Sequence, residues 1–246
     1  MTLLSELPKA RGWGVDLSPA ALAIAERNAG QLRLLDRVAL RQGSWDAALL
    51  PEDRQPFDLI VSNPPYVMSP PDQGGQRLVY RENNFIGDGL VETVVRQAPS
   101  HLTPGGTLQV LANWAITGDQ PWEDRLSGWA PAGADMWVIE RERLDPYAYI
   151  ELWLTDAGLA GDPSWSARYR EWLDYFTELG IRAIGMGWIT ITNAGRQTPD
   201  ITIESWPHAV HQPLGPAIAA RQRDITAARA SSISPSIAPY SSHCFR

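Results

Sequence analysis

The chain alternates short apolar runs with segments of helical periodicity over much of its length. Such alternation is typical of a mainly parallel sheet covered by helices, because consecutive parallel strands need a crossover connection, usually a helix. The expected strands are residues 12–17, 38–42, 57–62, 107–114 and 136–140, and the expected helices are 19–30, 88–101, 122–129, 146–156 and 165–179. The sequence therefore predicts an α/β fold.

Three local patterns refine this prediction. Ser18 and Pro19 provide a capping side chain and a first-turn proline for the helix that follows the first strand. Near the end, residues 181–192 and 201–206 alternate like strands around Asn193-Ala194-Gly195, which predicts a closing hairpin. The strand at 57–62 (FDLIVS) is almost continuously apolar after its second residue, so we expect it to be buried on both faces.

Composition excludes several classes of protein. With 246 residues, 44% of them apolar and 20% charged, the chain can bury a full core. It has no apolar run near the ~20 residues of a membrane helix, and its first residues lack the apolar stretch of a signal peptide, so a cytoplasmic protein without a membrane partner is expected. A net charge of −7 argues against a broad basic surface for nucleic acid, although a local groove stays possible.

Metal binding is not expected either. Cys244 is the one cysteine, which leaves no disulfide framework and no thiolate metal site. His208 and His211 lie three residues apart but beside prolines, where a metal-binding helix face is disfavoured.

Two segments of the chain lack the pattern of a regular helix or strand. Residues 67–81 are rich in proline, glycine and polar residues, and they follow the carboxyl end of a strand, which makes this loop a candidate lid or substrate clamp. From residue 213 the apolar periodicity fades. We therefore expect a main domain over 1–212 and a disordered or degenerate tail over 213–246.

The strongest chemical signal is the sequence Asn63-Pro64-Pro65-Tyr66 directly after FDLIVS. A proline pair alone can simply end a strand. With an asparagine before it and an aromatic residue after it, the segment can form a rigid receptor for an NH2 group. The Asn63 side-chain oxygen and the Pro64 carbonyl can both accept hydrogen bonds, and Tyr66 offers a ring on which a flat target can stack. Orienting a nitrogen in this way is mainly proximity catalysis and needs no strong base.

This segment resembles motif IV of the class I S-adenosylmethionine-dependent amino-methyltransferases, the group of HemK-type glutamine methyltransferases and of the adenine and guanine methylases. GVDLSPAALAIAERNA resembles the second strand and helix of that Rossmann-like fold. The resemblance implies that Asp16, with Leu17 beside it, binds the ribose hydroxyls of S-adenosylmethionine. Taken alone, Asp16 could equally cap the next helix.

RQGSWDAALL resembles the turn after the third strand, where family members usually place an acid against the adenine amino group. Ser44 and Trp45 occupy those places here, and Asp46 lies one residue further on. The resemblance makes Ser44 and Trp45 cofactor contacts, with Trp45 either stacked on adenine or packed in the core. The resemblance also makes Asn63 a cofactor contact.

The resemblance is incomplete at the amino end. Family members carry a glycine-rich loop after their first strand, and nothing before Gly12 resembles it. Residues 3–12 instead resemble the last part of the helix that follows the loop. The first strand and the loop are therefore expected to be missing, through an incomplete chain, a wrongly chosen start codon or a decayed gene.

After Tyr66 the chain departs from HemK-type enzymes and resembles actinobacterial methyltransferases of unassigned substrate. The candidate substrate contacts in this extension are Tyr80, Arg81, Asn84, Asp88, Asn113 and Trp114. Asp88 is better explained as a helix N-cap.

Two functions fit the sequence. The first is an N-methyltransferase that acts on a planar amino nitrogen of a protein glutamine, a nucleobase or a small amide or amine. The second is a catalytically inactive methyltransferase remnant or a partner-binding protein, because half a cofactor site would bind the cofactor more weakly and the incomplete sheet would expose an apolar strand edge.

Overall fold

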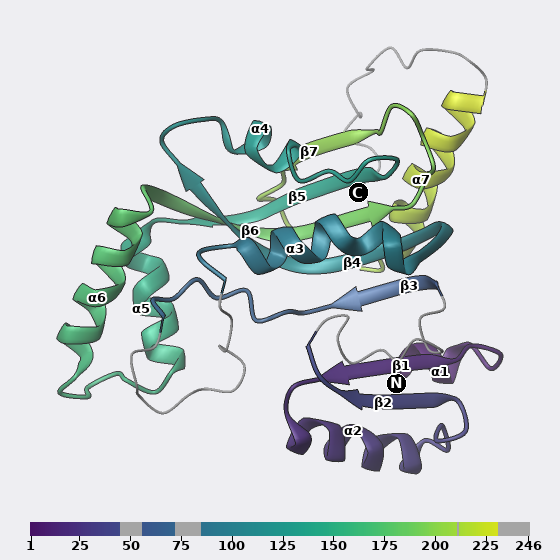
Figure 1. The fold of residues 1–246 in the computed structure, drawn as a ribbon, viewed down its shortest axis with the longest axis horizontal. Helices are drawn as coiled ribbons and strands as arrows, with labels where there is room; N and C mark the ends of the chain where they lie inside the picture. The colour runs from purple at the N-terminus through teal and green to yellow at the C-terminus, as the bar shows by residue number, and fades with distance from the viewer. Residues whose placement is uncertain (45–55, 72–84, 211, 231–246) are drawn as a thin grey trace. The chain divides into compact units, whose positions relative to one another are not determined.

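The computed structural model describes residues 1–44, 56–71, 85–210 and 212–230. It divides into two compact units, Met1–Trp206 and Pro207–Arg246. The first unit contains two sheets, one formed by β1 and β2 and the other by β3 to β7 (Figure 1). The predicted class, an α/β fold with a mainly parallel first part and antiparallel carboxyl-terminal strands, is confirmed.

The smaller sheet pairs β1 (Gly12–Asp16) with β2 (Val38–Gln42) in parallel, joined by α2 (Pro19–Gln31). The predicted start of α2 is confirmed, since the Ser18 hydroxyl accepts a hydrogen bond from the Ala21 N–H at 3.3 Å. The segment before β1 forms a short helix, α1 (Thr2–Glu6), consistent with the helical character expected there.

Arg37 fixes α1 to this sheet. Its guanidinium donates to the carbonyls of Leu4, Leu7 and Ala10 at 2.9 to 3.1 Å. These carbonyls lie at and after the end of α1, where helix carbonyls lack partners inside the helix. A cation at this end is also favoured by the helix dipole.

The larger sheet has the strand order β3-β4-β6-β5-β7. Its strands are β3 (Phe57–Ser62), β4 (Leu102–Thr117), β5 (Asp135–Leu144), β6 (Ile181–Thr192) and β7 (Ile201–Ser205). The β3–β4 and β5–β7 pairs are parallel, whereas β6 runs antiparallel to both β4 and β5.

The predicted closing hairpin of β6 and β7 is wrong. Both edges of β6 are already occupied, by β4 and by β5, so β7 pairs in parallel with β5 instead. Asn193 is therefore not a hairpin turn residue. Its backbone and side chain bond to the irregular start of β4: Gly105 N donates to its carbonyl at 2.7 Å, and its Nδ2 donates to the Leu102 carbonyl at 2.9 Å.

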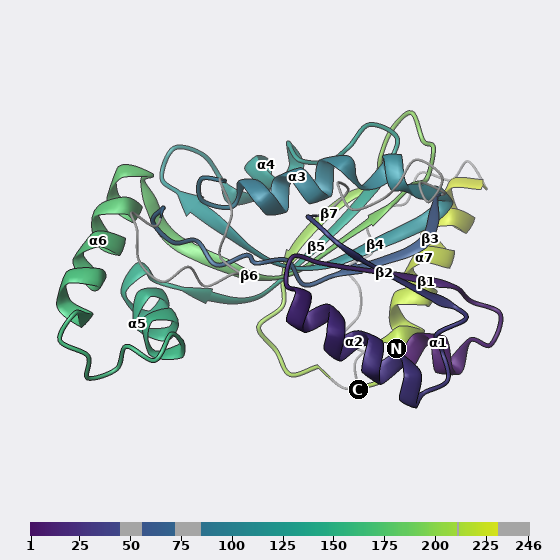
Figure 2. The same ribbon diagram turned by 60° about the horizontal axis from the view of Figure 1, so that its bottom comes forward.

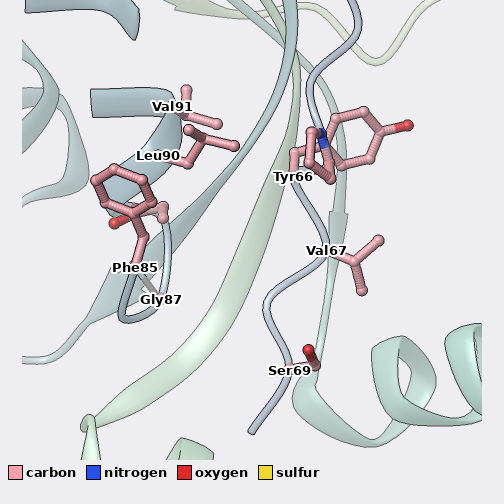
Figure 3. A pocket seen from close by; sticks show the side chains of 9 residues that line it. Tyr66, Val67, Ser69, Phe85, Gly87, Leu90 and Val91 are labelled. Carbon is pink, nitrogen blue, oxygen red and sulfur yellow. The ribbon is translucent and has the colours of Figure 1, made fainter. Parts of the chain in front are cut away.

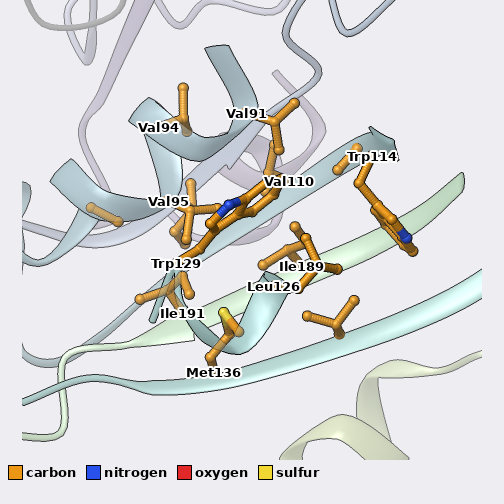
Figure 4. Close-up of a cluster of buried hydrophobic side chains, with 14 of the residues drawn as sticks. Val91, Val94, Val95, Val110, Trp114, Leu126, Trp129, Met136, Ile189 and Ile191 are labelled. Carbon is orange, nitrogen blue, oxygen red and sulfur yellow. The ribbon is translucent and has the colours of Figure 1, made fainter. Parts of the chain in front are cut away.

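Helices α3 (Gly89–Gln97) and α4 (Trp122–Ser127) cover one face of this sheet (Figure 2). Apolar side chains from both helices and from β4, β5 and β6 form the main core, shown in Figure 4. Its most deeply buried large residues are Trp114, Leu108, Leu126, Met136, Ile189 and Ile191. A short 3-10 helix, η3 (Ala98–His101), leads from α3 into β4.

A second core lies where α5 (Pro146–Asp156) and α6 (Trp165–Glu178) pack together near one end of the sheet (Figure 1). Tyr149, Trp172 and Phe176 pack with ring centroids about 6 Å apart. Met68, which follows the proline pair, is buried in the same cluster. The two tryptophan-rich helices therefore contact the segment after the Asn-Pro-Pro-Tyr sequence.

The prediction that β3 is buried on both faces is wrong. Leu59 is 41% exposed and Val61 63% exposed. β3 is the terminal strand of its sheet and pairs through one edge with β4, so part of its apolar surface stays uncovered. The continuous apolar run therefore produces an exposed apolar edge strand among the described residues.

The expected disorder after residue 213 is corrected for residues 215–230, which form the helix α7 (Gly215–Ala230). The expectation relied on the lack of an apolar face, whereas alanine and arginine have high intrinsic helix propensity. The structure divides the chain after Trp206, close to the expected boundary at 212. None of the helices within the described residues is both long and apolar enough to cross a membrane.

The exposed edge of β3 leads to a prediction about self-association. An apolar edge strand pairs readily with other chains, and an inserted lysine blocks such pairing. We expect Val61→Lys to reduce oligomer formation in sedimentation velocity at high protein concentration, with a change in unfolding free energy within about 0.5 kcal/mol. Leu152→Lys on α5, at a side chain 46% exposed, is the control. Equal effects of the two lysines would contradict an association through the strand edge.

Candidate functional site

The Asn-Pro-Pro-Tyr sequence lies immediately after β3, whose last residue is Ser62. Asn63 is exposed, and Pro64, Pro65 and Tyr66 are half-buried. The prolines lock their own φ angles and restrict the residue before them, so the backbone that carries Asn63 and the Pro64 carbonyl is stiff. An exposed amide on a stiff backbone can receive a hydrogen-bonding target without a large entropic cost.

A small pocket adjoins this segment (Figure 3). One wall is the chain from Pro65 to Ser69, and the other is the turn that leads from Phe85 into α3. Tyr66 belongs to the first wall, but in Figure 3 its ring points away from Phe85. The ring makes an edge contact with Trp153 of α5, with centroids 6.3 Å apart.

Across the pocket, Phe85 is 44% exposed, and Gly87 follows it with a φ of +59°. A side chain at Gly87 would be strained in this left-handed conformation. The Gly87 N–H donates to the Tyr175 hydroxyl of α6 at 2.9 Å. Burial raises the pKa of Tyr175 although this hydrogen bond opposes the change, so its hydroxyl stays protonated at neutral pH.

The start of α3 is fixed by a buried ion pair. Asp88 is 6% exposed, and its carboxylate accepts two hydrogen bonds from Arg125 at 2.6 and 2.8 Å and one from the Ala115 N–H at 2.7 Å. Burial opposes the charge of Arg125, but the hydrogen bonds and charge of Asp88 outweigh it and raise the pKa of Arg125. Asp88 occupies the N-cap position of α3 without making a capping bond, so the predicted capping role of its side chain is wrong.

The predicted cofactor residues meet at the carboxyl ends of β1 and β2. Asp16 ends β1 and is exposed, and one of its carboxylate oxygens accepts from the Ser18 N–H at 2.7 Å. The Gly43 N–H donates to the Asp16 carbonyl at 3.1 Å, and Gln42 Nε2 donates to the Leu17 carbonyl at 3.2 Å. Exposed Ser44 follows directly, so the structure brings Asp16, Leu17 and Ser44 together.

The carboxyl end of β3, which carries Asn63, is related to Asp16, Leu17 and Ser44 by the direction of the strands. In Figure 1 the arrows of β1, β2 and β3 point the same way. Near their starts, Trp13 of β1 makes an edge contact with Phe57 of β3, with ring centroids 5.5 Å apart. Ligands of open α/β sheets bind at the carboxyl ends of strands, which here carry Asp16 and Asn63.

Two predicted substrate contacts lie in the core instead. Asn113 is 2% exposed, and its Nδ2 donates to the Tyr149 hydroxyl at 3.0 Å. Trp114 is fully buried and stacks on Trp122 with centroids 5.7 Å apart. Alternation along β4 directs both side chains into packed layers, so the prediction that they bind substrate is corrected. Four other predicted contacts, Trp45, Tyr80, Arg81 and Asn84, lie outside the described residues.

Sequence reasoning missed Phe85, Tyr149 and Tyr175. Phe85 follows Asn84, one of the predicted substrate contacts, and its signal was an aromatic residue two positions before the turn glycine Gly87. Tyr149 and Tyr175 carry no local signal, because only tertiary packing brings their hydroxyls to the pocket walls. Within the ranges that the structure describes, no group of three or more His, Cys, Asp or Glu side chains is placed to hold a metal ion.

Comparison with known proteins adds independent findings. Residues 4–84 match the family described as RMKL-like, methyltransferase domain. The release factor glutamine methyltransferase of Cereibacter sphaeroides is 43% identical over 115 residues, which are 44% of this chain and 40% of that protein. The ribosomal protein uL3 glutamine methyltransferase of Bradyrhizobium diazoefficiens is 37% identical over 107 residues, 41% of this chain and 33% of that protein. The chain thus matches less than half the length of these relatives.

Solved structures give a weaker likeness. A SAM-dependent methyltransferase from Thiobacillus denitrificans, in complex with S-adenosyl-L-homocysteine, aligns at a TM-score of 0.35 and 13% identity, over 77% of this chain and 78% of that one.

The Asp88–Arg125 pair yields a stability prediction. Removing one member of a buried pair leaves the other without compensation, and Arg125 is 21% exposed, so we expect Asp88→Asn to lower the free energy of unfolding by about 2–3 kcal/mol. Glu92→Gln is the matched control, because it breaks the exposed Glu92–Arg96 pair and should change stability by at most about 0.5 kcal/mol. Urea unfolding measures both, and similar values for the two variants would refute the buried anchor.

Proposed function

We infer the function of this chain from the family to which it belongs, the class I S-adenosylmethionine-dependent methyltransferases of the HemK type. We propose that it transfers a methyl group from S-adenosylmethionine to the nitrogen of a planar amide or amino group. The observation that carries this proposal is the exposed Asn63 on a proline-stiffened segment, at the carboxyl end of a parallel strand and beside a pocket.

The acceptor side of the proposed reaction follows from hydrogen bonding. An NH2 group donates one hydrogen to the Asn63 side-chain oxygen and the other to the Pro64 carbonyl. Both acceptors belong to a segment whose backbone the prolines restrict, so the nitrogen is held in one orientation. Fixing this orientation supplies the main rate enhancement through proximity, and the proton released on methylation passes to water.

The donor side uses the residues that meet at the ends of β1 and β2. S-adenosylmethionine, when bound, supplies an electrophilic methyl group on its sulfonium sulfur. Asp16 is exposed and uses one carboxylate oxygen locally, so the carboxylate retains acceptor capacity for ribose hydroxyls. Leu17, 37% exposed, and Ser44 provide the adjoining apolar and polar contacts. The exposed residues present at this end therefore fit a nucleoside, and Trp45 stays a proposed contact.

The acceptor class that we propose is a glutamine side chain of a protein. The names of the relatives, a release factor and a ribosomal protein glutamine methyltransferase, favour it. The net charge of −7 also disfavours a polyanionic acceptor. A nucleobase or a small amide is the alternative that the labelling experiment below distinguishes.

A second candidate function is that of a catalytically inactive, partner-binding protein. The exposed apolar edge of β3, with Val61 63% exposed, favours it.

Calorimetric titration with S-adenosylmethionine separates these two functions. Saturable binding to the chain, lost in Asp16→Ala, supports the methyltransferase. No detectable heat up to millimolar cofactor would sink the enzymatic function of this chain and favour the partner-binding alternative.

The receptor role of Asn63 is tested by substitution. We expect Asn63→Ala to abolish methyl transfer and to leave cofactor affinity within a few-fold of the parent, because its side chain acts mainly on the acceptor nitrogen. Asp16→Ala should show the opposite pattern, with cofactor affinity reduced. Transfer of tritiated methyl groups to proteins of a bacterial extract is the measurement, and an Asn63→Ala protein with full activity contradicts the assignment.

The same extract identifies the acceptor class. Label that protease removes and nuclease leaves supports protein glutamine as the acceptor. Nuclease-sensitive label would replace that proposal with a nucleic-acid acceptor.

A further inference from the structure

Both walls of the pocket beside Asn63 are held by tyrosine hydroxyls from one pair of helices. On the wall that follows the proline pair, the Met68 N–H donates to the Tyr149 hydroxyl of α5 at 3.1 Å. On the opposite wall, the Gly87 N–H donates to the Tyr175 hydroxyl of α6 at 2.9 Å. Neither backbone donor belongs to a helix or a strand, so these hydroxyls supply partners that regular structure does not.

Tyr149 is a fixed anchor and not a mobile surface ring. It is fully buried, and its hydroxyl also accepts from Asn113 Nδ2 of β4 at 3.0 Å. Its ring contacts Trp172 and Phe176 of α6, with centroids 6.5 and 5.9 Å away. The position of Met68 is therefore tied both to the central sheet and to α6.

Helix α5 also contacts the Asn-Pro-Pro-Tyr segment directly. Trp153, one helical turn after Tyr149, contacts the Tyr66 ring at 6.3 Å and the Tyr149 ring at 6.0 Å. Residues four apart lie on the same face of a helix, so one face of α5 carries both contacts. Tyr66 and Met68 are thus restrained by α5, while Gly87 is restrained by α6.

Since α5 and α6 pack on each other through a shared core, the distance between the two pocket walls depends on this helix pair. We propose that the α5–α6 pair sets the width of the acceptor pocket, with Tyr149 and Tyr175 as positioning residues. This inference rests on the proposed function for its biological meaning. Phe85, Leu90 and Val91 give one side of the pocket apolar groups, and among the described residues that line it the carboxylate of Asp88 is paired with Arg125. The pocket therefore suits a small, uncharged amide group.

The experiment uses single hydroxyl deletions in the full chain, Tyr149→Phe and Tyr175→Phe, with Tyr147→Phe as the control. Tyr147 lies on the same helix α5 and is 60% exposed. Acetamide, a small planar amide like the end of a glutamine side chain, is the probe. Its affinity is measured from chemical shift changes of the Met68 and Gly87 amides in NMR titrations, which need no catalytic activity.

We expect the parent and Tyr147→Phe to bind acetamide equally, and each pocket variant to bind it about five- to tenfold more weakly, as the loss of one hydrogen bond implies. Amide hydrogen exchange should become faster at Met68 only in Tyr149→Phe, and at Gly87 only in Tyr175→Phe. Tyr175 is half-buried, so its variant should fold even if the fully buried Tyr149 does not tolerate the change.

Equal acetamide affinity in all four proteins, or no binding to the parent, overturns the inference. Faster exchange without weaker binding overturns it as well, because the hydroxyls would then be structural alone. Failure of the proposed function has a different signature: tyrosine-dependent acetamide binding would remain while the parent transfers no methyl group to any extract component.

Discussion

The double pairing of β4 is the constraint on which the rest of the larger sheet depends. This strand bonds in parallel to β3 on one edge and antiparallel to β6 on the other. The parallel pair directs the carboxyl end of β3, and with it Asn63, towards the edge where such sheets bind ligands. The antiparallel pair makes β6 central, and the α5 and α6 helices that precede β6 in the chain share its core.

The pocket illustrates how a short exposed segment gains a defined shape. The prolines stiffen the chain at Asn63, but the walls of the pocket beside this segment are irregular. Their backbone donors are satisfied by side chains, and the opposite wall is further fixed by the carboxylate of Asp88, which joins β4 and α4 through Ala115 and Arg125. Helices α5 and α6 thus contact the pocket walls through Tyr149, Trp153 and Tyr175.

Much of the fold could be predicted from local sequence. The strands 38–42 and 57–62 and the helix 146–156 have the predicted bounds, because apolar periodicity, Pro146 and the capping side chain of Asp145 act locally. Which strands pair with each other was harder to predict from the sequence. The alternation in β6 and β7 is the same whether they form a hairpin or flank β5, and only the occupation of both β6 edges decides.

The candidate site also contains residues that local sequence can indicate and residues that only tertiary packing reveals. Asn63 to Tyr66 and Asp16 could be named as candidates because their chemistry lies in consecutive residues at strand ends, and their roles stay predictions. Asn113 and Trp114 were misassigned, because an asparagine that bonds to a buried tyrosine cannot be told from a substrate contact by sequence. Tyr149 and Tyr175 lie more than 80 residues from their partners in the chain, so no local pattern reveals them.

We propose that the methyl donor and the acceptor nitrogen meet at the carboxyl ends of β1 and β3. Photolabelling tests it most directly: the chain is irradiated with tritiated S-adenosylmethionine, digested, and the labelled peptides are identified by mass spectrometry. We predict label in peptides that contain Asp16 or Asn63, and its loss when excess S-adenosylhomocysteine competes. Label confined to α5 and α6, or label that the competitor does not displace, would contradict the account.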